Sequence, residues 1–144
     1  MAKDKSNERG QGLLEATLVT LSFFIILVGI IDVGQVLFVH QSIVERVRGA
    51  IRYGVVHDYD ATAIRNKVLY DQATLPDGSD PDDPPAGFLG LTAANVAVSR
   101  EDATFNEDRL IVTVSDYSFS FFTPFIAGHY RGKPITASMP FEGL

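Results

Sequence analysis

One long apolar segment dominates the first half of the chain. Within residues 13–39, the only charged side chains are Glu15 and Asp32. A helix over residues 13–31 would be about 28 Å long at a rise of 1.5 Å per residue, close to the ~30 Å hydrocarbon core of a bilayer. This length and composition predict a helix that inserts into a membrane.

Two other interpretations of this segment fit less well. A secretory signal peptide has an apolar region of roughly 7–15 residues that ends at a small-x-small cleavage site, whereas here a longer run is followed by Asp-Val-Gly-Gln at 32–35. A core helix of a small soluble domain is rarely apolar on every side. The cations Lys3, Lys5 and Arg9 precede the segment, so the positive-inside rule predicts a cytoplasmic N-terminus and a C-terminal part across the membrane.

A second pattern of apolar residues predicts that the helix continues beyond the membrane. Apolar or small residues recur there at spacings of three and four, which places them on one stripe of a helix: Val36, Val39, Ile43, Val47, Ala50, Ile51 and Gly54. We therefore expect one helix from Gln11 to Tyr53, about 65 Å long. Its first half would be apolar all round, and its second half would carry a small domain.

Asp32 has two possible roles within this helix. It either marks the outer membrane interface or makes an internal polar contact inside an assembly. Gly29 and Gly34 flank it. Because glycine costs roughly 1 kcal/mol in a helix relative to alanine, a local bend or loosening is expected here.

Residues 55–144 are expected to form that small domain. Near-helical spacing predicts a short helix over residues 61–73, capped by Asp60 or Thr62. Residues 75–87 hold four of the seven prolines and are expected to form a loop. Four acids in this loop suggest calcium, but their spacing does not match a calcium-binding EF loop, so a solvated acidic loop is the preferred interpretation; they are Asp77, Asp80, Asp82 and Asp83.

Period-two alternation predicts three strands in the rest of the domain, over residues 95–99, 110–114 and 135–142. A turn at residues 106–109 would join the first two. The apolar parity flips past Ser115, which implies a β-bulge or twist near Asp116. The aromatic stretch at 119–125 either packs on the helix or contacts another subunit. The fold class is therefore α+β, with a three-stranded antiparallel sheet packed on the amphipathic half of the long helix.

The distribution of charge and the residue types present argue against several classes of function. Residues 1–53 carry a net charge of +1 and residues 54–144 a net charge of −7. An acidic domain does not favour nucleic acid, because phosphate binding relies on clustered Lys and Arg. The chain has no cysteine, which excludes disulfides and thiolate zinc sites. No cofactor, metal-ligand spacing or catalytic motif is found, and we expect a protein that is not an enzyme.

The junction at residues 9–15, Arg-Gly-Gln-Gly-Leu-Leu-Glu, resembles the processing site of type IV pilin-like proteins. Within these proteins, the sequence of the helix is most similar to the TadE-like branch, from tight-adherence (Tad) pilus systems. Gly-Ile-Ile-Asp-Val-Gly at 29–34 and Arg-Gly-Ala-Ile-Arg-Tyr-Gly at 48–54 carry that similarity. The resemblance covers residues 9–54.

This resemblance implies roles for several residues. A prepilin peptidase would cut between Gly10 and Gln11, which makes Glu15 the fifth residue of the mature chain. The new α-amine of one subunit could then neutralise Glu15 of a neighbour, since an intramembrane carboxylate usually has a partner. Without this role, Glu15 would be a helix-start acid near the headgroups. We place Glu15 and Asp32 among the assembly residues, and the helix-packing positions are Leu13, Leu14, Leu18, Phe23 and Phe24.

The expected organisation has three parts: a cytoplasmic leader at 1–10, a membrane and assembly helix at 11–54, and an extracytoplasmic domain at 55–144. The resemblance implies a pilin-like subunit of the bacterial inner membrane that assembles into a pilus or pseudopilus for adhesion or secretion. Its partners would be copies of itself or other pilins, prepilin peptidase, the inner-membrane assembly platform and the lipid bilayer. The alternative is a permanently anchored single-pass protein whose outer domain binds a partner in an envelope complex.

Overall fold

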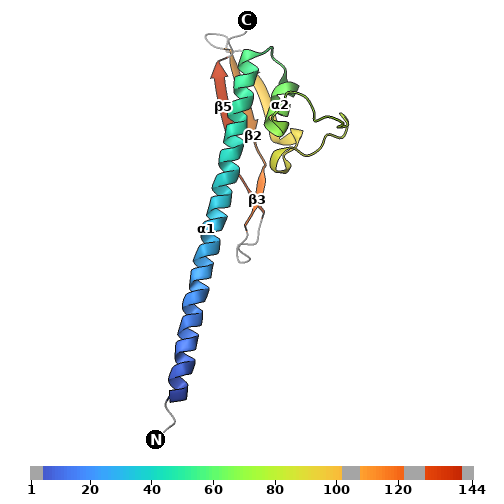
Figure 1. The fold of residues 1–144 in the computed structure, drawn as a ribbon. Coiled ribbons are helices and arrows are strands. Elements are labelled where there is room, and N and C mark those ends of the chain that lie inside the picture. The colour runs from blue at the N-terminus through green and yellow to red at the C-terminus, as the bar shows by residue number, and fades with distance from the viewer. Residues whose placement is uncertain (1–4, 102–107, 122–128, 141–144) are drawn as a thin grey trace.

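A single long helix is the dominant element of the computed structural model, which describes residues 5–101, 108–121 and 129–140 (Figure 1). Helix α1 runs without interruption over Lys5–Val56, 52 residues that span about 78 Å at 1.5 Å per residue. The first proline of the chain is Pro76, so no residue of α1 lacks a backbone hydrogen-bond donor. The helix predicted over Gln11 to Tyr53 is confirmed, and it extends further at both ends.

Gly29 and Gly34 do not interrupt α1. Helical hydrogen bonding continues through both positions, and no heavy atom lies within 4 Å of a β-carbon built on either of them. The loosening predicted at this point is therefore not observed. The favourable environment of a continuous helix outweighs a cost of roughly 1 kcal/mol per glycine.

Burial divides α1 into two parts. Residues 10–27 are exposed on every side. Asp32 is the first buried position, and from Val39 on buried positions recur on the same face at helical spacing: Val39, Ile43, Val47, Ala50, Ile51 and Gly54. This second part is the predicted amphipathic half, and its buried face is the one on which the domain packs.

The short helix α2 spans Ala61–Tyr70 and has a defined cap at each end. The Asp60 carboxylate accepts the backbone N–H groups of Thr62 and Ala63 at 2.8 and 3.2 Å, which satisfies two of the free donors of the first turn. Asp71 adopts a left-handed conformation with φ of 62° and ends the helix. The predicted cap at Asp60 is confirmed, and the helix ends earlier than the predicted residue 73.

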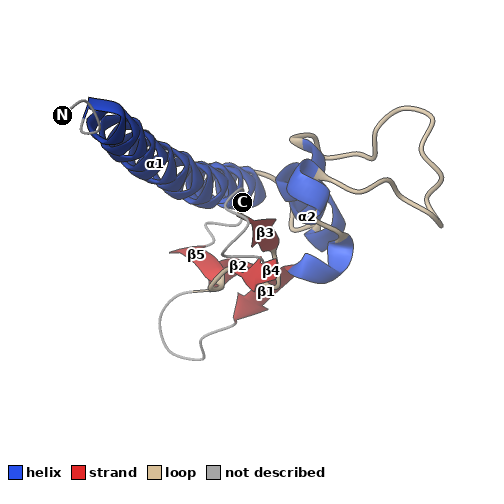
Figure 2. Cartoon of the chain, turned by 90° about the horizontal axis from the view of Figure 1, so that it is seen from below, coloured by secondary structure: helices blue, strands red, loops and turns tan. Residues whose placement is uncertain are grey.

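The main sheet has three antiparallel strands in the order β1-β2-β5 (Figure 2). They are β1 (Val96–Glu101), β2 (Arg109–Val114) and β5 (Ile135–Pro140). The central strand β2 alternates in burial, with Leu110, Val112 and Val114 in the core. Helix α1 packs across β5 and β2 while α2 packs on β1, so both helices cover one face of the sheet. The predicted α+β fold is confirmed.

A second, two-stranded ribbon was not predicted. The sequence suggested that the strand ending at Val114 would continue past a bulge near Asp116. Instead Asp116 has a φ of 56°, and β3 (Ser118–Ser120) pairs with β4 (His129–Arg131) as a separate ribbon. The ribbon leads away from the main sheet toward the N-terminal half of α1 (Figure 1). The break near Asp116 was placed correctly, but its interpretation as a bulge or twist within one continuous strand was wrong.

Several predictions fall partly or wholly outside the described residues. These are the turn at 106–109, of which residues 106 and 107 are not described, the end of the last strand at 141–142, and the greater part of the aromatic stretch at 119–125.

A connection between α2 and β1 closes the domain against α1. It contains two short 3-10 turns, η1 (Phe88–Gly90) and η2 (Ala93–Asn95). The Arg46 guanidinium lies over the Phe88 ring, 4.0 Å from its centroid, and its Nη1 donates to the Val68 carbonyl oxygen at 3.3 Å. Arg46 thus ties α1 both to the last turn of α2 and to η1.

Candidate functional site

The predicted processing site lies on the first turns of α1. Gly10 and Gln11 are both helical and exposed, and no heavy atom approaches the open side of Gly10 or Gly12. Two glycines within three residues make this the least stable part of the helix, because each costs roughly 1 kcal/mol relative to alanine. A short stretch around Gly10 can therefore unwind at low free-energy cost.

Glu15 lies one turn beyond Gln11 on the same side of α1. Residues four apart on a helix are neighbours on its surface, so a cut after Gly10 would create its α-amine near the side that carries Glu15. Glu15 is exposed, and no helix or strand of the described part of the domain lies at this level of the helix (Figure 1). The carboxylate is therefore available to a group outside the chain.

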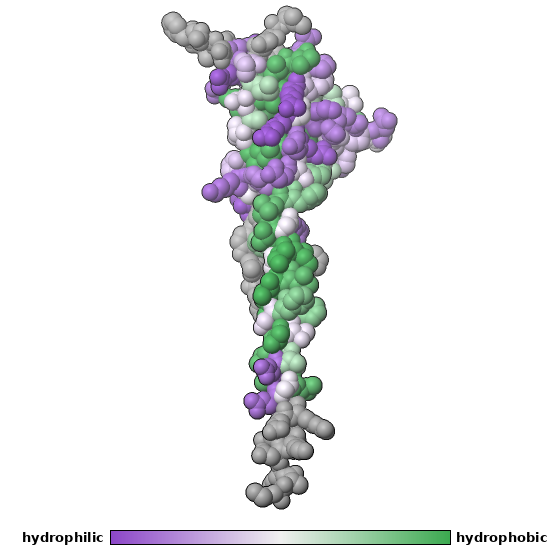
Figure 3. All heavy atoms as spheres, turned by 60° about the vertical axis from the view of Figure 1, so that its left-hand side comes forward, coloured by the Kyte–Doolittle hydropathy of each residue, from purple (hydrophilic) through white to green (hydrophobic). Residues whose placement is uncertain are grey.

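The predicted helix-packing residues surround Glu15 with exposed apolar surface. Each of them is more than half exposed: Leu13, Leu14, Leu18, Phe23 and Phe24. The helix has a mean hydropathy of 2.4 in its most apolar window, and 6% of that window is buried inside the chain. By length and composition α1 can cross a membrane. The space-filling view shows this column of hydrophobic residues below the polar domain (Figure 3).

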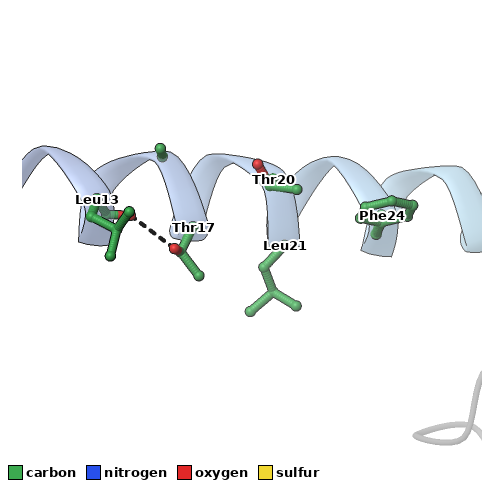
Figure 4. Close-up of a pocket in the computed structure, with 6 residues that line it drawn as sticks. Leu13, Thr17, Thr20, Leu21 and Phe24 are labelled. Carbon is green, nitrogen blue, oxygen red and sulfur yellow. Dashed lines mark hydrogen bonds between the residues drawn. The ribbon is translucent and has the colours of Figure 1, made fainter.

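A shallow groove on the side of α1 away from Glu15 was not predicted. Its lining residues are Leu13, Ala16, Thr17, Thr20, Leu21 and Phe24 (Figure 4). The groove exists because Ala16, Thr17 and Thr20 are small while Leu21 and Phe24 beside them are large. This alternation of small and large residues at helical spacing is the sequence signal that could have identified it, since small residues allow close approach between membrane helices.

Two hydroxyl groups in the apolar part are satisfied within the helix. The Thr17 Oγ1 donates to the Leu13 carbonyl oxygen at 2.8 Å (Figure 4). The Ser22 Oγ donates to the Leu18 carbonyl oxygen at 2.9 Å. Such bonds to the preceding turn remove the need for water. Neither hydroxyl therefore opposes insertion into hydrocarbon.

Asp32 lies apart from this surface. It is 3% exposed and belongs to the same buried stripe as Val39 and Ile43, on the side of α1 that faces the domain. The sequence suggested either an outer interface marker or an internal polar contact, and the structure places the side chain inside its own chain. An assembly role for Asp32 stays a prediction.

The ribbon is attached to α1 close to His40. Tyr117 is buried, and its hydroxyl lies 3.5 Å from the His40 Nδ1. Burial raises the pKa of the Tyr117 hydroxyl. Beside it, Arg131 and Asp116 form an exposed ion pair at 3.5 Å. These contacts fix the level of the ribbon along the helix axis, and sequence analysis did not identify them.

The acidic loop shows no arrangement of ligands. Asp77, Asp80, Asp82 and Asp83 are exposed, and the Asp80 carboxylate accepts the backbone N–H of Asp82 at 2.9 Å. Within residues 5–101, 108–121 and 129–140, no three His, Asp or Glu side chains come together as a candidate metal site.

The chain thus combines a membrane-length helix that is apolar all round, its amphipathic continuation and a small α+β domain. Residues 10–52 match the family model described as TadE-like protein. The similarity to TadE-like proteins is therefore confirmed over these residues, which form most of α1. No curated protein and no solved structure matches the chain.

Proposed function

We propose that this protein is a structural subunit of a Tad-type pilus or pseudopilus that assembles through α1. One observation carries the proposal: residues 10–27 are exposed on every side of a helix that can cross a membrane. Covering one Leu or Phe side chain is worth roughly 1.5–3 kcal/mol when it leaves water. This surface therefore requires lipid before assembly and neighbouring helices after it.

The apolar surface also has features of a helix-packing surface. Its groove of small residues gives a neighbouring backbone room to approach, and association of helices in lipid depends on such close packing. Phe23 and Phe24 stand edge to face, 5.9 Å between ring centroids, and present two large side chains to a neighbour. Every residue of this surface from 10 to 27 is exposed.

Processing after Gly10 would prepare the helix for assembly. The weak helix around Gly10 and Gly12 supports access for prepilin peptidase, which must reach the backbone. The cut removes the leader and creates an α-amine on Gln11. In a bundle of such helices, this amine pairs with Glu15 of a neighbouring copy and disfavours wrong axial registers, because an unpaired carboxylate in an apolar bundle is costly.

The proposed path of the subunit follows from this chemistry. It is inserted in the bacterial inner membrane with a cytoplasmic N-terminus and an outer C-terminal domain, as the leader cations favour. Prepilin peptidase trims it, and the assembly platform adds it to a filament used for adhesion or secretion. Its role is structural rather than catalytic.

The alternative, a permanently anchored protein that binds a partner through its domain, requires no contact between α1 helices. Cross-linking distinguishes the two. The chain has no cysteine, so Leu18→Cys introduces a single thiol on the exposed apolar surface, and Leu89→Cys introduces one on the exposed surface of the domain.

Oxidation of bacterial envelopes that contain Leu18→Cys should give disulfide-linked dimers, while Leu89→Cys should give far fewer. Because one thiol per chain permits only dimers, a second helix position such as Phe24→Cys in the same chain should extend them to a ladder. Monomers alone from both helix variants would support the permanently anchored protein and contradict assembly through α1.

A further inference from the structure

We infer that an exposed surface around Gly34 on α1 is a docking site for the apolar part of α1 from a second copy of this chain, displaced outward along the helix axis. We call it the Gly34 surface, and it consists of Ile30, Ile31, Gly34, Leu37 and Phe38. The inference rests on the proposed function and names one contact between subunits of the assembly.

Gly34 lies at the centre of a ring of large apolar side chains. Residues three and four positions away on a helix are neighbours on its surface, and around Gly34 all four of these positions hold Ile, Leu or Phe. Each is more than half exposed: Ile30, Ile31, Leu37 and Phe38. Because glycine has no side chain, this ring leaves room at its centre for a side chain or backbone of another helix.

The fold of the chain does not itself use this room. No heavy atom lies within 4 Å of a β-carbon built on Gly34, although the residue is helical and glycine weakens a helix relative to alanine. Gly54 shows the opposite case, because a β-carbon there would lie 2.6 Å from a Leu110 side-chain atom and 2.7 Å from one of Ile64. Gly54 thus serves the packing of the domain, whereas the room at Gly34 faces outward.

Lipid does not cover the upper part of the Gly34 surface. The β3–β4 ribbon is attached beside His40 and leads from there toward the N-terminal half of α1 (Figure 1). It has two strands and therefore two open edges, whose backbone groups cannot be satisfied in hydrocarbon. The hydrocarbon core consequently ends below the ribbon, and Leu37 and Phe38 lie outside it. An exposed apolar patch in this position indicates a protein contact.

A second copy of α1 is the occupant that fits. The Gly34 surface continues the apolar column below it (Figure 3), which in the proposed function packs against α1 helices of other copies. Two Gly34 surfaces that faced each other would make an isologous contact and close a dimer, whereas a filament needs a heterologous contact between two different surfaces. Residues 16–27 provide the second surface, because they are exposed on every side and carry no charge.

This contact requires an axial displacement between the two copies. Both copies enter the membrane in the same orientation, so their helices run parallel. The middle of residues 16–27 lies about 20 Å from Gly34 at 1.5 Å per residue, and the second copy is displaced outward by this distance. Two fully inserted copies lie at the same height and do not make the contact. Since a helical bundle places different neighbours at different heights, the contact is compatible with the pairing at Glu15.

Filling the centre of the Gly34 surface tests its role in assembly. Gly34→Leu adds a side chain where the fold has open space. We expect the yield of sheared filaments to fall at least tenfold, while the amount of protein in the membrane fraction stays unchanged and the urea midpoint of the full chain in detergent does not fall. Normal filaments, or a lowered urea midpoint, would overturn the inference.

The matched control is Gly49→Leu. Gly49 is also helical and exposed with no atom near its open side. The residues three and four positions away from it do not form an apolar ring, and they are Glu45, Arg46, Arg52 and Tyr53. Gly49→Leu should leave the filament yield unchanged. An equal fall in both variants would overturn the inference, because the loss would then not be specific to the Gly34 surface.

Cross-linking tests the identity of the occupant. The chain has no cysteine, so cells can produce together a full-length copy with Leu37→Cys and a differently tagged full-length copy with Leu21→Cys. After oxidation we expect mixed dimers in sheared filaments, and at least tenfold fewer in the membrane fraction, where the copies lie at one height. Homodimers of Leu37→Cys as the main product would mean that two Gly34 surfaces meet, and would overturn the inference.

The same experiment separates this inference from the proposed function. If no dimer contains Leu37→Cys while Leu18→Cys still gives dimers, the inference is wrong and assembly through α1 stands. If neither variant gives dimers, assembly through α1 is contradicted together with the inference.

Discussion

Gly132 lies so close to the ring of Tyr117 that a β-carbon on residue 132 would overlap the ring carbons and the hydroxyl oxygen. The Gly132 backbone N–H also donates to the Tyr117 carbonyl oxygen at 2.9 Å. Together these contacts hold Tyr117 at 6% exposure beside His40. The base of the β3–β4 ribbon is thereby attached to α1 at one defined height.

Replacement of this glycine should loosen the attachment. Gly132→Ala forces the Tyr117 ring to move, and overpacking of this kind costs about 1–3 kcal/mol. The free energy of unfolding in urea, measured on the full chain in detergent, should fall by this amount. The matched control is Gly49→Ala, since Gly49 is helical with no atom near its open side, and alanine there should stabilise by up to about 1 kcal/mol. Equal effects of the two substitutions would refute the contact.

Tyr117 should also give the domain a dependence on alkaline pH. Burial raises its pKa above the ordinary value of 10.0, so the folded state holds the hydroxyl proton more tightly than the unfolded state. This stabilisation is fully present below pH 10.0 and is lost as the pH rises through the higher folded value. Urea midpoints of wild type and Tyr117→Phe should therefore diverge between pH 8 and pH 11, with the wild type losing more. Parallel pH dependence would show that Tyr117 does not contribute.

Arg46 should stabilise the junction of α1 and α2 through the shape of its guanidinium as well as its charge. Arg46→Lys keeps the charge but loses the planar stack on Phe88 and the bond to the Val68 carbonyl oxygen. We expect a loss of about 1–2 kcal/mol in unfolding free energy. Arg48→Lys is the control, because Arg48 is exposed and has only a 4.0 Å contact with Glu45, and it should change stability by less than about 0.5 kcal/mol. Similar values for both would remove the special role of Arg46.

Glu15→Ala should prevent assembly without preventing insertion. The substitution removes the carboxylate that would pair with a neighbour's α-amine, and it makes the helix more apolar, so fractionation should still find the protein in the membrane. The yield of sheared filaments should drop at least tenfold. Glu45→Ala makes the same chemical change at the exposed, domain-bearing part of α1 and should leave the yield unchanged. Normal filaments from Glu15→Ala would disprove the pairing.

The elements with a long or regular pattern were predicted from sequence, and the reasons are physical. Helix α1 has no proline and an unbroken apolar or amphipathic period. Strand β2 alternates in burial, with Leu110, Val112 and Val114 buried, so its buried positions are the apolar positions that the sequence marks. Asp60 was recognisable as a cap because its side chain precedes a helical period. In each case local sequence and tertiary packing favour the same structure.

The ribbon and the orientation of Asp32 were not predictable in this way. Strands β3 and β4 have three residues each, too short for an alternation to be recognised, and they are paired across a connection of eight residues. The sequence gives the distance of Asp32 along the helix but not which side the domain covers. Only the fold shows that its side chain is enclosed while Val33, its neighbour in sequence, is exposed.

The most direct test of the proposed function is the N-terminus of the assembled protein. Filaments sheared from cells, and the membranes left behind, would be analysed by N-terminal sequencing and intact mass. The account predicts that filament material begins at Gln11, with the leader found only on unassembled protein in the membrane. Assembled material that retains residues 1–10 would contradict processing and, with it, the pairing of a new α-amine with Glu15.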